Sequence, residues 1–339
     1  VEVVDAERSG SPGRRLIGIG SDQLEIARSE RHERIAGAEP PVGPSDFGDD
    51  TGRAGERGNR GVEVGRGMDE VIDHRHEPIL PGDDRYVRAM SAEIGSEFAG
   101  RVAIVTGSSS GIGEATAHRL SALGATVVVN SSSSVDAGEA VSAALPGDSC
   151  YVRADISVQE EGHALVDRTI ERYGQLDFLI NNAGWTTQIP HGNLDELTDE
   201  IFRKTFDVNV FGTWWLTKRA IPHLRKSDDP NIVNITSIAG VRPVGSSMAY
   251  SMAKAALNQM TQLLAKSYGP IRVNAVAPGL VATPWTEDWD AMHALIAKIA
   301  PVPRSATPDD CAEAVLALLR NKYASGEIFV VDGGSTLTM

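Results

Sequence analysis

Lysine is missing from the first 203 residues of the chain, and cysteine is scarce throughout, with Cys150 and Cys311 the only two. Two thiols in so long a chain argue against a disulfide framework and a cysteine-rich zinc site, and they favour a reducing compartment. No apolar run reaches the roughly 18 residues that a membrane helix needs. Residues 1–5 lack the positive-then-apolar order of a signal peptide. These absences predict a cytoplasmic protein without a metal site or a membrane span.

Positive charge is also in short supply. The chain carries 46 acidic side chains against 32 lysines and arginines, which gives a formal net charge of −14. Binding to nucleic acid needs clustered basic residues that neutralise the phosphates. The acidic balance therefore argues against nucleic acid as a main partner.

The first 97 residues differ in composition from the rest. They are rich in glycine, arginine and acidic residues, and their apolar clusters are short. Such a segment buries too little apolar surface to offset the entropy of ordering, so we predict that it is disordered. An alternative is an over-long reading frame, with Met90 as the true start. The composition thus predicts an extension over residues 1–97 and one domain over residues 98–339.

From residue 98 onward, apolar strands alternate with helical patterns. Seven strands are predicted, at residues 101–106, 124–129, 151–154, 176–180, 231–235, 271–277 and 327–331. The intervening helices are predicted at residues 114–123, 158–173, 199–224, 248–268 and 308–319. The strands are apolar throughout, as in a parallel sheet that helices cover on both faces. This order predicts an α/β fold, a doubly wound parallel sheet of seven strands in a single domain.

A glycine-rich turn joins the first strand to the first helix. Gly107, Gly111 and Gly113 follow the pattern Gly-x-x-x-Gly-x-Gly. Free amides at a helix N-terminus attract a pyrophosphate, and glycines let the backbone approach it closely. The turn therefore predicts a phosphate-binding site.

The end of the second strand predicts which cofactor binds. An acidic residue there would accept hydrogen bonds from a ribose 2′-hydroxyl and would repel a 2′-phosphate. The chain instead has Asn130 followed by serines at positions 131–134. This favours NADP. No arginine or lysine follows the strand to pair with the phosphate, so NAD stays possible.

Tyr250 and Lys254 lie four residues apart in the predicted helix 248–268, so they share one face. A cation about 4 Å from a phenol, at an effective dielectric near 20, is worth roughly 4 kcal/mol, or about three pKa units. We therefore expect Lys254 to bring the pKa of Tyr250 close to the range of an acid/base catalyst. Ser237 follows the strand 231–235 and is expected to reach the same substrate oxygen.

Together these motifs resemble the short-chain dehydrogenase/reductase family, over roughly residues 98–337. The resemblance rests on residues 106–113, 155, 181–184, 207–210, 237–254, 278–283 and 331–334. It implies a Rossmann-like fold and a hydride transfer between nicotinamide and a ketone or secondary alcohol. The implied catalytic residues are Asn209, Ser237, Tyr250 and Lys254. The implied cofactor residues are Gly107, Ser108, Ser110, Gly111, Ile112, Gly113, Asn130, Ser131, Asp155, Ile156, Asn182, Ala183, Gly184, Tyr250, Lys254, Pro278, Gly279, Val281 and Thr283.

The resemblance also implies a role for each member of the tetrad. Tyr250 is the general acid for reduction and the base for oxidation, and Ser237 stabilises the oxygen on which charge develops. Lys254 lowers the pKa of Tyr250 and binds the nicotinamide ribose. Asn209 kinks its helix and holds a water that links Lys254 to solvent.

The substrate is less well defined. Trp185 and Trp285 predict an apolar or planar substrate that touches Ser237 and Tyr250, under a lid helix at residues 284–292. A 3-oxoacyl thioester and a sugar or polyol both stay open, as does a second hypothesis, a catalytically silent nucleotide-binding regulator. The aromatic residues 214–215 are interpreted as a subunit interface, in a homotetramer or a homodimer.

Overall fold

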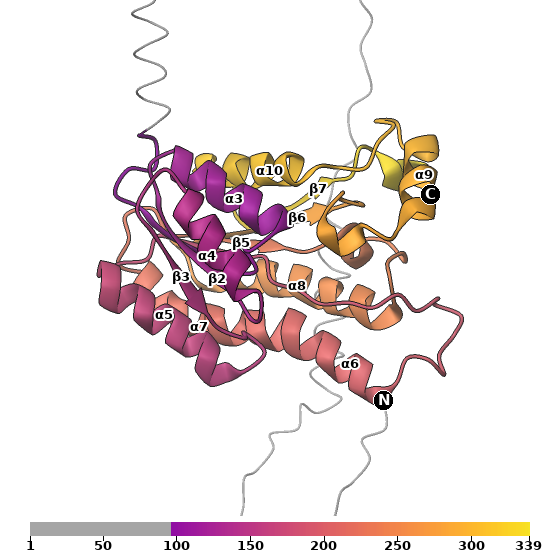
Figure 1. The fold of residues 1–339 in the computed structure, drawn as a ribbon, viewed down its shortest axis with the longest axis horizontal. Helices are drawn as coiled ribbons and strands as arrows, with labels where there is room; N and C mark the ends of the chain where they lie inside the picture. The colour runs from indigo at the N-terminus through magenta and orange to yellow at the C-terminus, as the bar shows by residue number, and fades with distance from the viewer. Residues whose placement is uncertain (1–95) are drawn as a thin grey trace, which may run out of the picture. The chain divides into compact units, whose positions relative to one another are not determined.

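The computed structural model describes residues 96–339, so the predicted extension lies almost wholly outside the described residues. The described chain contains seven strands, β1 (Val102–Val105), β2 (Thr126–Ser131), β3 (Ser149–Arg153), β4 (Phe178–Asn181), β5 (Asn231–Ile235), β6 (Arg272–Pro278) and β7 (Ile328–Val331). They form one parallel sheet in the order β3-β2-β1-β4-β5-β6-β7 (Figure 1). The predicted doubly wound parallel sheet is confirmed. Its strand order reverses between β1 and β4.

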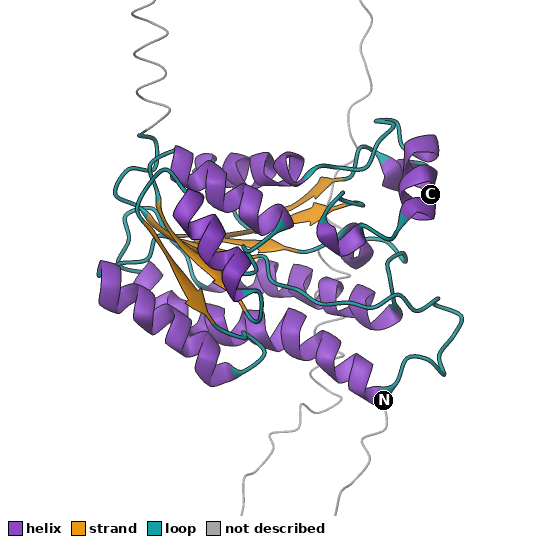
Figure 2. Ribbon diagram, in the orientation of Figure 1, coloured by secondary structure: helices purple, strands orange, loops and turns teal. Residues whose placement is uncertain are grey.

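Helices cover both faces of this sheet (Figure 2). One layer contains α3 (Gly111–Ala122), α4 (Val135–Ala144) and α10 (Pro308–Arg320), and the other contains α5 (Gln159–Tyr173), α7 (Thr213–Leu224) and α8 (Met248–Ser267). Because side chains alternate along a strand, β1 supplies Ala103 and Val105 to the first layer and Ile104 to the second. Both faces are therefore apolar cores, which explains why the strands show no polar alternation.

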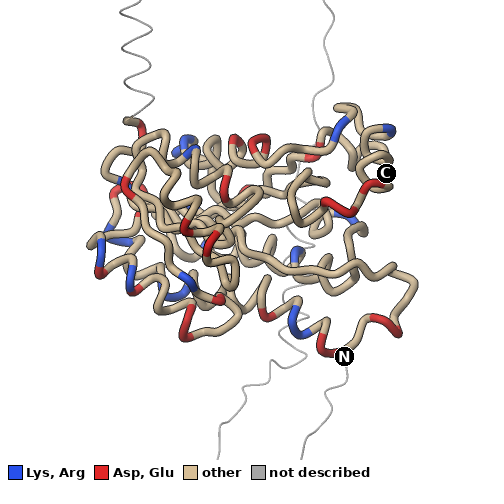
Figure 3. Tube along the Cα trace, in the orientation of Figure 1, with Lys and Arg blue, Asp and Glu red and all other residues tan. Residues whose placement is uncertain are grey.

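Charged residues lie mainly on the outer helices and loops, and few of them lie on the central strands (Figure 3). Within residues 96–339, no helix combines the length and the apolarity that crossing a bilayer requires.

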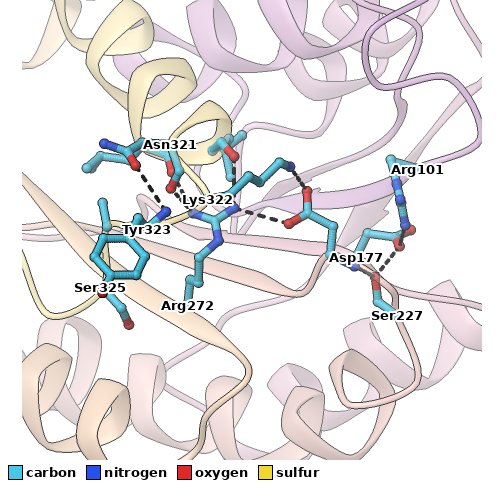
Figure 4. A network of polar contacts seen from close by, with 12 residues as sticks. Arg101, Asp177, Ser227, Arg272, Asn321, Lys322, Tyr323 and Ser325 are labelled. Carbon is cyan, nitrogen blue, oxygen red and sulfur yellow. Dashed lines mark hydrogen bonds and ion pairs between the residues drawn. The ribbon is translucent and has the colours of Figure 1, made fainter.

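Charge networks hold the amino-terminal ends of the strands (Figure 4). Asp177, just before β4, is 2% exposed and accepts hydrogen bonds from Arg101 and Ser227. Arg272, at the start of β6, donates to three carbonyl oxygens at the end of α10 and just beyond it, and it pairs with Asp229 at 3.2 Å. Removing one partner of a buried ion pair costs about 3–5 kcal/mol. These contacts fix one end of the sheet, and the carboxyl ends of the strands are left to form a site.

Three helical segments differ from the predicted ones. The helix α4 was not predicted at all. The predicted helix 199–224 is divided into α6 (Asp199–Phe206), a π-helical turn η1 (Asp207–Gly212) and α7. The predicted lid helix is a short 3₁₀ turn, η3 (Pro284–Thr286), followed by a separate helix, α9 (Asp290–Ile299).

Candidate active site

A cavity of about 1550 Å³ opens at the carboxyl ends of the strands. It lies where the strand order reverses, the place at which open α/β sheets bind ligands. Most of the predicted cofactor residues line it, namely Gly107, Ser110, Gly111, Ile112, Asn130, Ser131, Asp155, Ile156, Asn182, Ala183, Gly184, Tyr250, Lys254, Pro278, Gly279, Val281 and Thr283. The structure therefore brings together residues that lie up to 176 positions apart, from Gly107 to Thr283.

The glycine turn forms a close-fitting cradle at one wall of the cavity. Gly107 and Gly111 both have φ of +60°, a conformation that favours glycine. A β-carbon at Gly113 would lie 2.4 Å from the carbonyl oxygen of Gly107, so a larger residue does not fit. The helix α3 begins at Gly111, and its N-cap, Ser110, makes no side-chain cap. First-turn amides therefore lack a side-chain acceptor at this end of α3, as a pyrophosphate requires.

Ser108 supports this turn from within. Its side chain is fully buried and donates to the carbonyl oxygen of Val105 at 2.7 Å. Ser108 does not line the cavity, and its backbone N–H donates to the carbonyl oxygen of Asn130, so the structure gives it a supporting role and not the predicted cofactor contact. Asn182 adds a second support, because its side-chain amide donates to the carbonyl oxygens of Thr106 and Gly107.

At the end of the cavity beside β2 and β3, the side chains predicted to bind the adenosine are already hydrogen-bonded within the protein. The side-chain amide of Asn130 donates to the carbonyl oxygens of Val152 and Ala154. The Ser131 hydroxyl lies 2.8 Å from the hydroxyl of Tyr151. Both predicted residues line the cavity, yet their side chains brace β2 against β3. The first serine beyond them, Ser132, is exposed.

A cation that sequence reasoning missed lies at this same end. Arg153 comes from β3, lines the cavity, and donates through Nε to the carbonyl oxygen of Ser132 at 2.9 Å. No arginine or lysine directly follows β2, as the sequence showed, but the neighbouring strand brings Arg153 to the same end of the cavity. The pairing of the parallel strands β2 and β3 places the arginine there, since Arg153 is the register partner of Ser131.

The turn after β6 faces the glycine turn across the cavity. A β-carbon at Gly111 would lie 3.2 Å from Cγ2 of Thr283. The backbone N–H of Gly279 donates to the carbonyl oxygen of Val331 at 2.9 Å, which fixes the start of the turn. The two walls leave a narrow passage between the glycine turn and the catalytic residues.

Ser237, Tyr250 and Lys254 meet at the centre of the cavity wall. Ser247 caps α8 by accepting a hydrogen bond from the backbone N–H of Tyr250, which places the phenol in the first helical turn. A β-carbon at Gly240 would lie 2.6 Å from the carbonyl carbon of Lys254. This close approach of backbones presses the segment after β5 onto α8. Ser237 consequently reaches the Tyr250 hydroxyl and forms a hydrogen bond with it.

The pKa values in this cluster differ from the expected ones. Tyr250 is partly exposed to the cavity, but burial of its hydroxyl raises its pKa to about 12, and the hydrogen bond with Ser237 only partly offsets this. Burial lowers the pKa of Lys254 to about 7. The Lys254 ammonium donates to the carbonyl oxygen of Ile235 at 2.9 Å and lies 5.5 Å from the centre of the Tyr250 ring. The expectation that Lys254 brings the pKa of Tyr250 close to the catalytic range is therefore wrong, because desolvation dominates both groups.

Asn209 lies behind this cluster, in the π-helical turn η1. Its side-chain amide donates to the carbonyl oxygens of Trp185 and Thr205, at 2.7 and 2.8 Å. Its Oδ1 atom is buried, with no hydrogen-bond partner among the described residues. A β-carbon at Gly184 would lie 2.9 Å from this oxygen and 3.6 Å from Nζ of Lys254. The π-helical turn interrupts the helix at Asn209, and an acceptor suited to a water lies near the lysine.

Three tryptophans form the outer, apolar part of the cavity. The rings of Tyr250 and Trp285 are 6.4 Å apart and edge to face. Trp185 packs under the ammonium of Lys204, 4.4 Å from its ring centre. Trp289 and α9 complete this part of the wall. The predicted substrate residues thus lie beside Tyr250.

Polar groups also line this part of the cavity, among them Thr186 and Ser246, whose hydroxyls are hydrogen-bonded to each other at 2.6 Å. His191 lines it, and its Nε2 atom is buried with no partner among the residues that the structure describes. The segment that carries His191 is tied to the opposite wall, because the backbone N–H of Ile189 donates to the carbonyl oxygen of Ser246 at 2.7 Å. At the mouth, Arg203 and Lys204 are balanced by Glu200 and Asp207.

Comparisons with known proteins agree with this geometry. A family model described as enoyl-(acyl carrier protein) reductase matches residues 107–336. The protein named "Granaticin polyketide synthase putative ketoacyl reductase 2", from Streptomyces violaceoruber, is 49% identical over 240 residues, 70% of this chain and 96% of that protein. Cis-4-hydroxycyclohexanecarboxylate dehydrogenase from Sinomonas cyclohexanicum is 36% identical over 251 residues, 72% of this chain and 99% of that protein.

A solved structure extends the likeness to the whole described fold. Thermoplasma acidophilum aldohexose dehydrogenase has a TM-score of 0.65 at 30% identity, and the match covers 72% of this chain and 97% of that one. The family resemblance inferred from the motifs is therefore confirmed. The chain belongs to the short-chain dehydrogenase/reductase family, whose members act on CH–OH groups with NAD or NADP.

Proposed function

We propose that this protein is an NADP(H)-dependent reductase that converts a ketone into a secondary alcohol, with Tyr250 as the proton donor. The observation that carries the proposal is the common cavity of the glycine turn and the Ser237–Tyr250 pair. A dinucleotide held at the glycine turn and a carbonyl held at Tyr250 would share one enclosed space. When bound, the cofactor supplies the hydride, and the residues of this chain supply position and the proton.

Tyr250 is in the protonated state that a proton donor in a reduction needs. A phenol with a pKa of about 12 keeps its proton at neutral pH. It is therefore ready to donate that proton to a carbonyl oxygen that gains negative charge, while the Ser237 hydroxyl donates a second hydrogen bond. The reverse reaction would need the phenol to lose its proton first. That loss is harder at neutral pH in this buried setting.

Lys254 and Asn209 have positioning roles in the proposal. Lys254 fixes the floor of the site through its bond to the Ile235 carbonyl oxygen. With a pKa of about 7, it can exchange a proton near neutral pH. The unpaired Oδ1 of Asn209 is suited to hold a water beside it, which would return a proton to the cluster after each turnover.

The apolar wall favours a ketone with an extended apolar or ring-shaped body. Trp285 lies edge to face with Tyr250, and Trp185, Met292 and Leu295 line the same cavity. A sugar or polyol would need many hydrogen-bond partners on this wall. The relative named as a ketoacyl reductase supports the same choice, a 3-oxoacyl thioester or a related ketone. Arg242 does not line the cavity, so we assign it no role in substrate binding.

The test is a panel of carbonyl compounds with NADPH and, separately, with NADH. We expect loss of NADPH absorbance with 3-oxoacyl thioesters and ring ketones, and slower loss with NADH. Aldohexoses and polyols, assayed with NADP in the oxidative direction, form the second group. Faster turnover of that group would replace the ketone assignment by a sugar or polyol dehydrogenase. Tight binding of NADPH with no turnover across the panel would indicate a silent regulator instead.

A further inference from the structure

The cavity extends to the carboxyl ends of β2 and β3, where most of its lining residues are polar. One wall consists of the serines that follow β2, and Ser132, Ser133 and Ser134 are all exposed. The other wall begins at Arg153. Because Ser131 and Arg153 are register partners in adjacent parallel strands, the arginine lies directly beside the serine segment.

The guanidinium of Arg153 is held in a fixed place. Its Nε donates to the carbonyl oxygen of Ser132, and its Nη1 donates to Glu161 on α5, both at 2.9 Å. Glu161 is itself fixed, because its carboxylate accepts the backbone N–H of Asp155 at 2.7 Å. Nη2 has no partner among residues 96–339, and the side chain is 51% exposed. The Nε and Nη1 atoms of the guanidinium thus hold it in position, and Nη2 is available for a ligand.

No carboxylate at the end of β2 competes for Nη2 of Arg153. Position 130 at the strand end is an asparagine, and both hydrogens of its amide are already bonded to backbone carbonyls. The Asp155 carboxylate accepts from the backbone N–H and the hydroxyl of Ser157. A positioned guanidinium bonded to the backbone of a three-serine segment that lines the same cavity offers donors suited to a phosphate.

Resting on the proposed function, we infer that Arg153 binds the 2′-phosphate of NADP(H), with Glu161 as the residue that positions it. The serine hydroxyls at 132–134 complete the phosphate subsite. The inference assigns cofactor preference to a residue of β3, where the sequence after β2 offers no cation. It also explains how a chain with a formal charge of −14 attracts this anion, through one local cation.

The test measures binding of two cofactor fragments by calorimetry, adenosine 2′,5′-bisphosphate and adenosine 5′-phosphate. A hydrogen-bonded charge is worth about 1.5–3 kcal/mol, so Arg153→Ala should weaken the bisphosphate by about 10- to 100-fold. The monophosphate should keep its affinity within about twofold. Arg168→Ala is the matched control, since Arg168 is exposed on α5 and does not line the cavity. It should leave both affinities unchanged.

Glu161→Gln provides a second measurement. The amide keeps an oxygen that can accept from Arg153, but it no longer neutralises the guanidinium. The bisphosphate should therefore bind a few-fold more tightly than to the unmodified chain, and the increase should vanish when Arg153→Ala is added. An unchanged affinity would remove Glu161 from the account, and a weaker one would show that its charge, and not only its oxygen, is needed to position Arg153.

The outcomes separate this inference from the proposed function. If the unmodified chain binds both fragments equally, or Arg153→Ala weakens both equally, the Arg153 assignment is refuted and the reductase proposal is untouched. If neither fragment nor NADPH binds, both fail together. A selective loss of the bisphosphate in Arg153→Ala supports the inference independently of any turnover.

Discussion

Replacing Tyr250 by phenylalanine tests the chemistry of the site with the smallest change of shape. One hydroxyl disappears, and with it the proton donor and its hydrogen bond with Ser237. Loss of a positioned general acid should lower kcat by about 10²- to 10⁴-fold. One hydrogen bond contributes about 0.5–1.5 kcal/mol, so the free energy of unfolding should change by no more than about that amount.

The assay combines NADPH consumption, NADPH binding and thermal unfolding on the same preparation. Turnover should fall while the dissociation constant for NADPH changes less than about threefold, because a phenol hydroxyl is one contact among many. Tyr268→Phe is the matched control, at the far end of α8 and outside the cavity, where the ring stacks with Arg225. Near-normal turnover in Tyr250→Phe would refute the assignment of the proton donor.

Three further predictions follow from the described geometry. Gly113→Ala places a β-carbon 2.4 Å from the Gly107 carbonyl oxygen. It should therefore weaken NADPH binding more than tenfold, a loss of about 1.4 kcal/mol. Gly192→Ala is the control, because its β-carbon would have no atom within 4 Å, and it should leave NADPH binding unchanged. Lys254→Met should abolish turnover and raise thermal stability most at low pH. The pKa of Lys254 falls to about 7 on folding, so the unfolded chain binds more protons above that pH, and wild-type stability rises from about pH 7 toward pH 10, by at most about 5 kcal/mol. The stability gained by Lys254→Met over the unmodified protein should therefore shrink between about pH 7 and pH 10. If thermal unfolding shows the same stability difference at every pH, a buried lysine with a lowered pKa is contradicted. Trp214, 38% exposed on α7, is proposed to lie in a subunit interface, so Trp214→Lys should lower the mass measured by sedimentation if the chain is a tetramer or dimer.

Much of the fold could be predicted from the sequence, because buried parallel strands leave a plain apolar signal. All seven strands were placed within a few residues of their observed bounds. The helix α4 gave no such signal. It contains Gly138, and a β-carbon there would lie 2.3 Å from the Tyr151 ring. The glycine that weakens the helical pattern is therefore required by packing against β3, which sequence periodicity does not reveal.

The interruption at η1 has a similar explanation. Asn209 was identified as unusual in a helix interior, and the structure shows its amide donating to the carbonyl oxygen of Thr205, four residues earlier. Gly212 also requires space, since a β-carbon there would lie 2.7 Å from the carbonyl oxygen of Ile156. The contact of Asn209 with Thr205 is local, whereas the contact of Gly212 with Ile156 is tertiary. The lid was divided for a local reason, because Thr283 and Thr286 form a capping box around η3.

The sequence predicted which residues form the candidate site better than it predicted their pKa values. Ser237, Tyr250 and Lys254 meet as expected. The estimate for Tyr250 took an effective dielectric near 20 and left out burial, which dominates its pKa in the structure. Arg153 could not be found from the residues that follow β2, because it lies in a different strand. The neighbouring strand supplies the cation, and strand order is not visible in a local motif.

The most direct measurement of the central claim is deuterium transfer from NADPH labelled at its transferable nicotinamide position. With an accepted ketone, the account predicts that the unmodified protein places the label on the carbinol carbon of the alcohol, and that Tyr250→Phe, still binding NADPH, produces almost none. A labelled product formed equally well by the variant would contradict the account, as would turnover in which the alcohol carries no label.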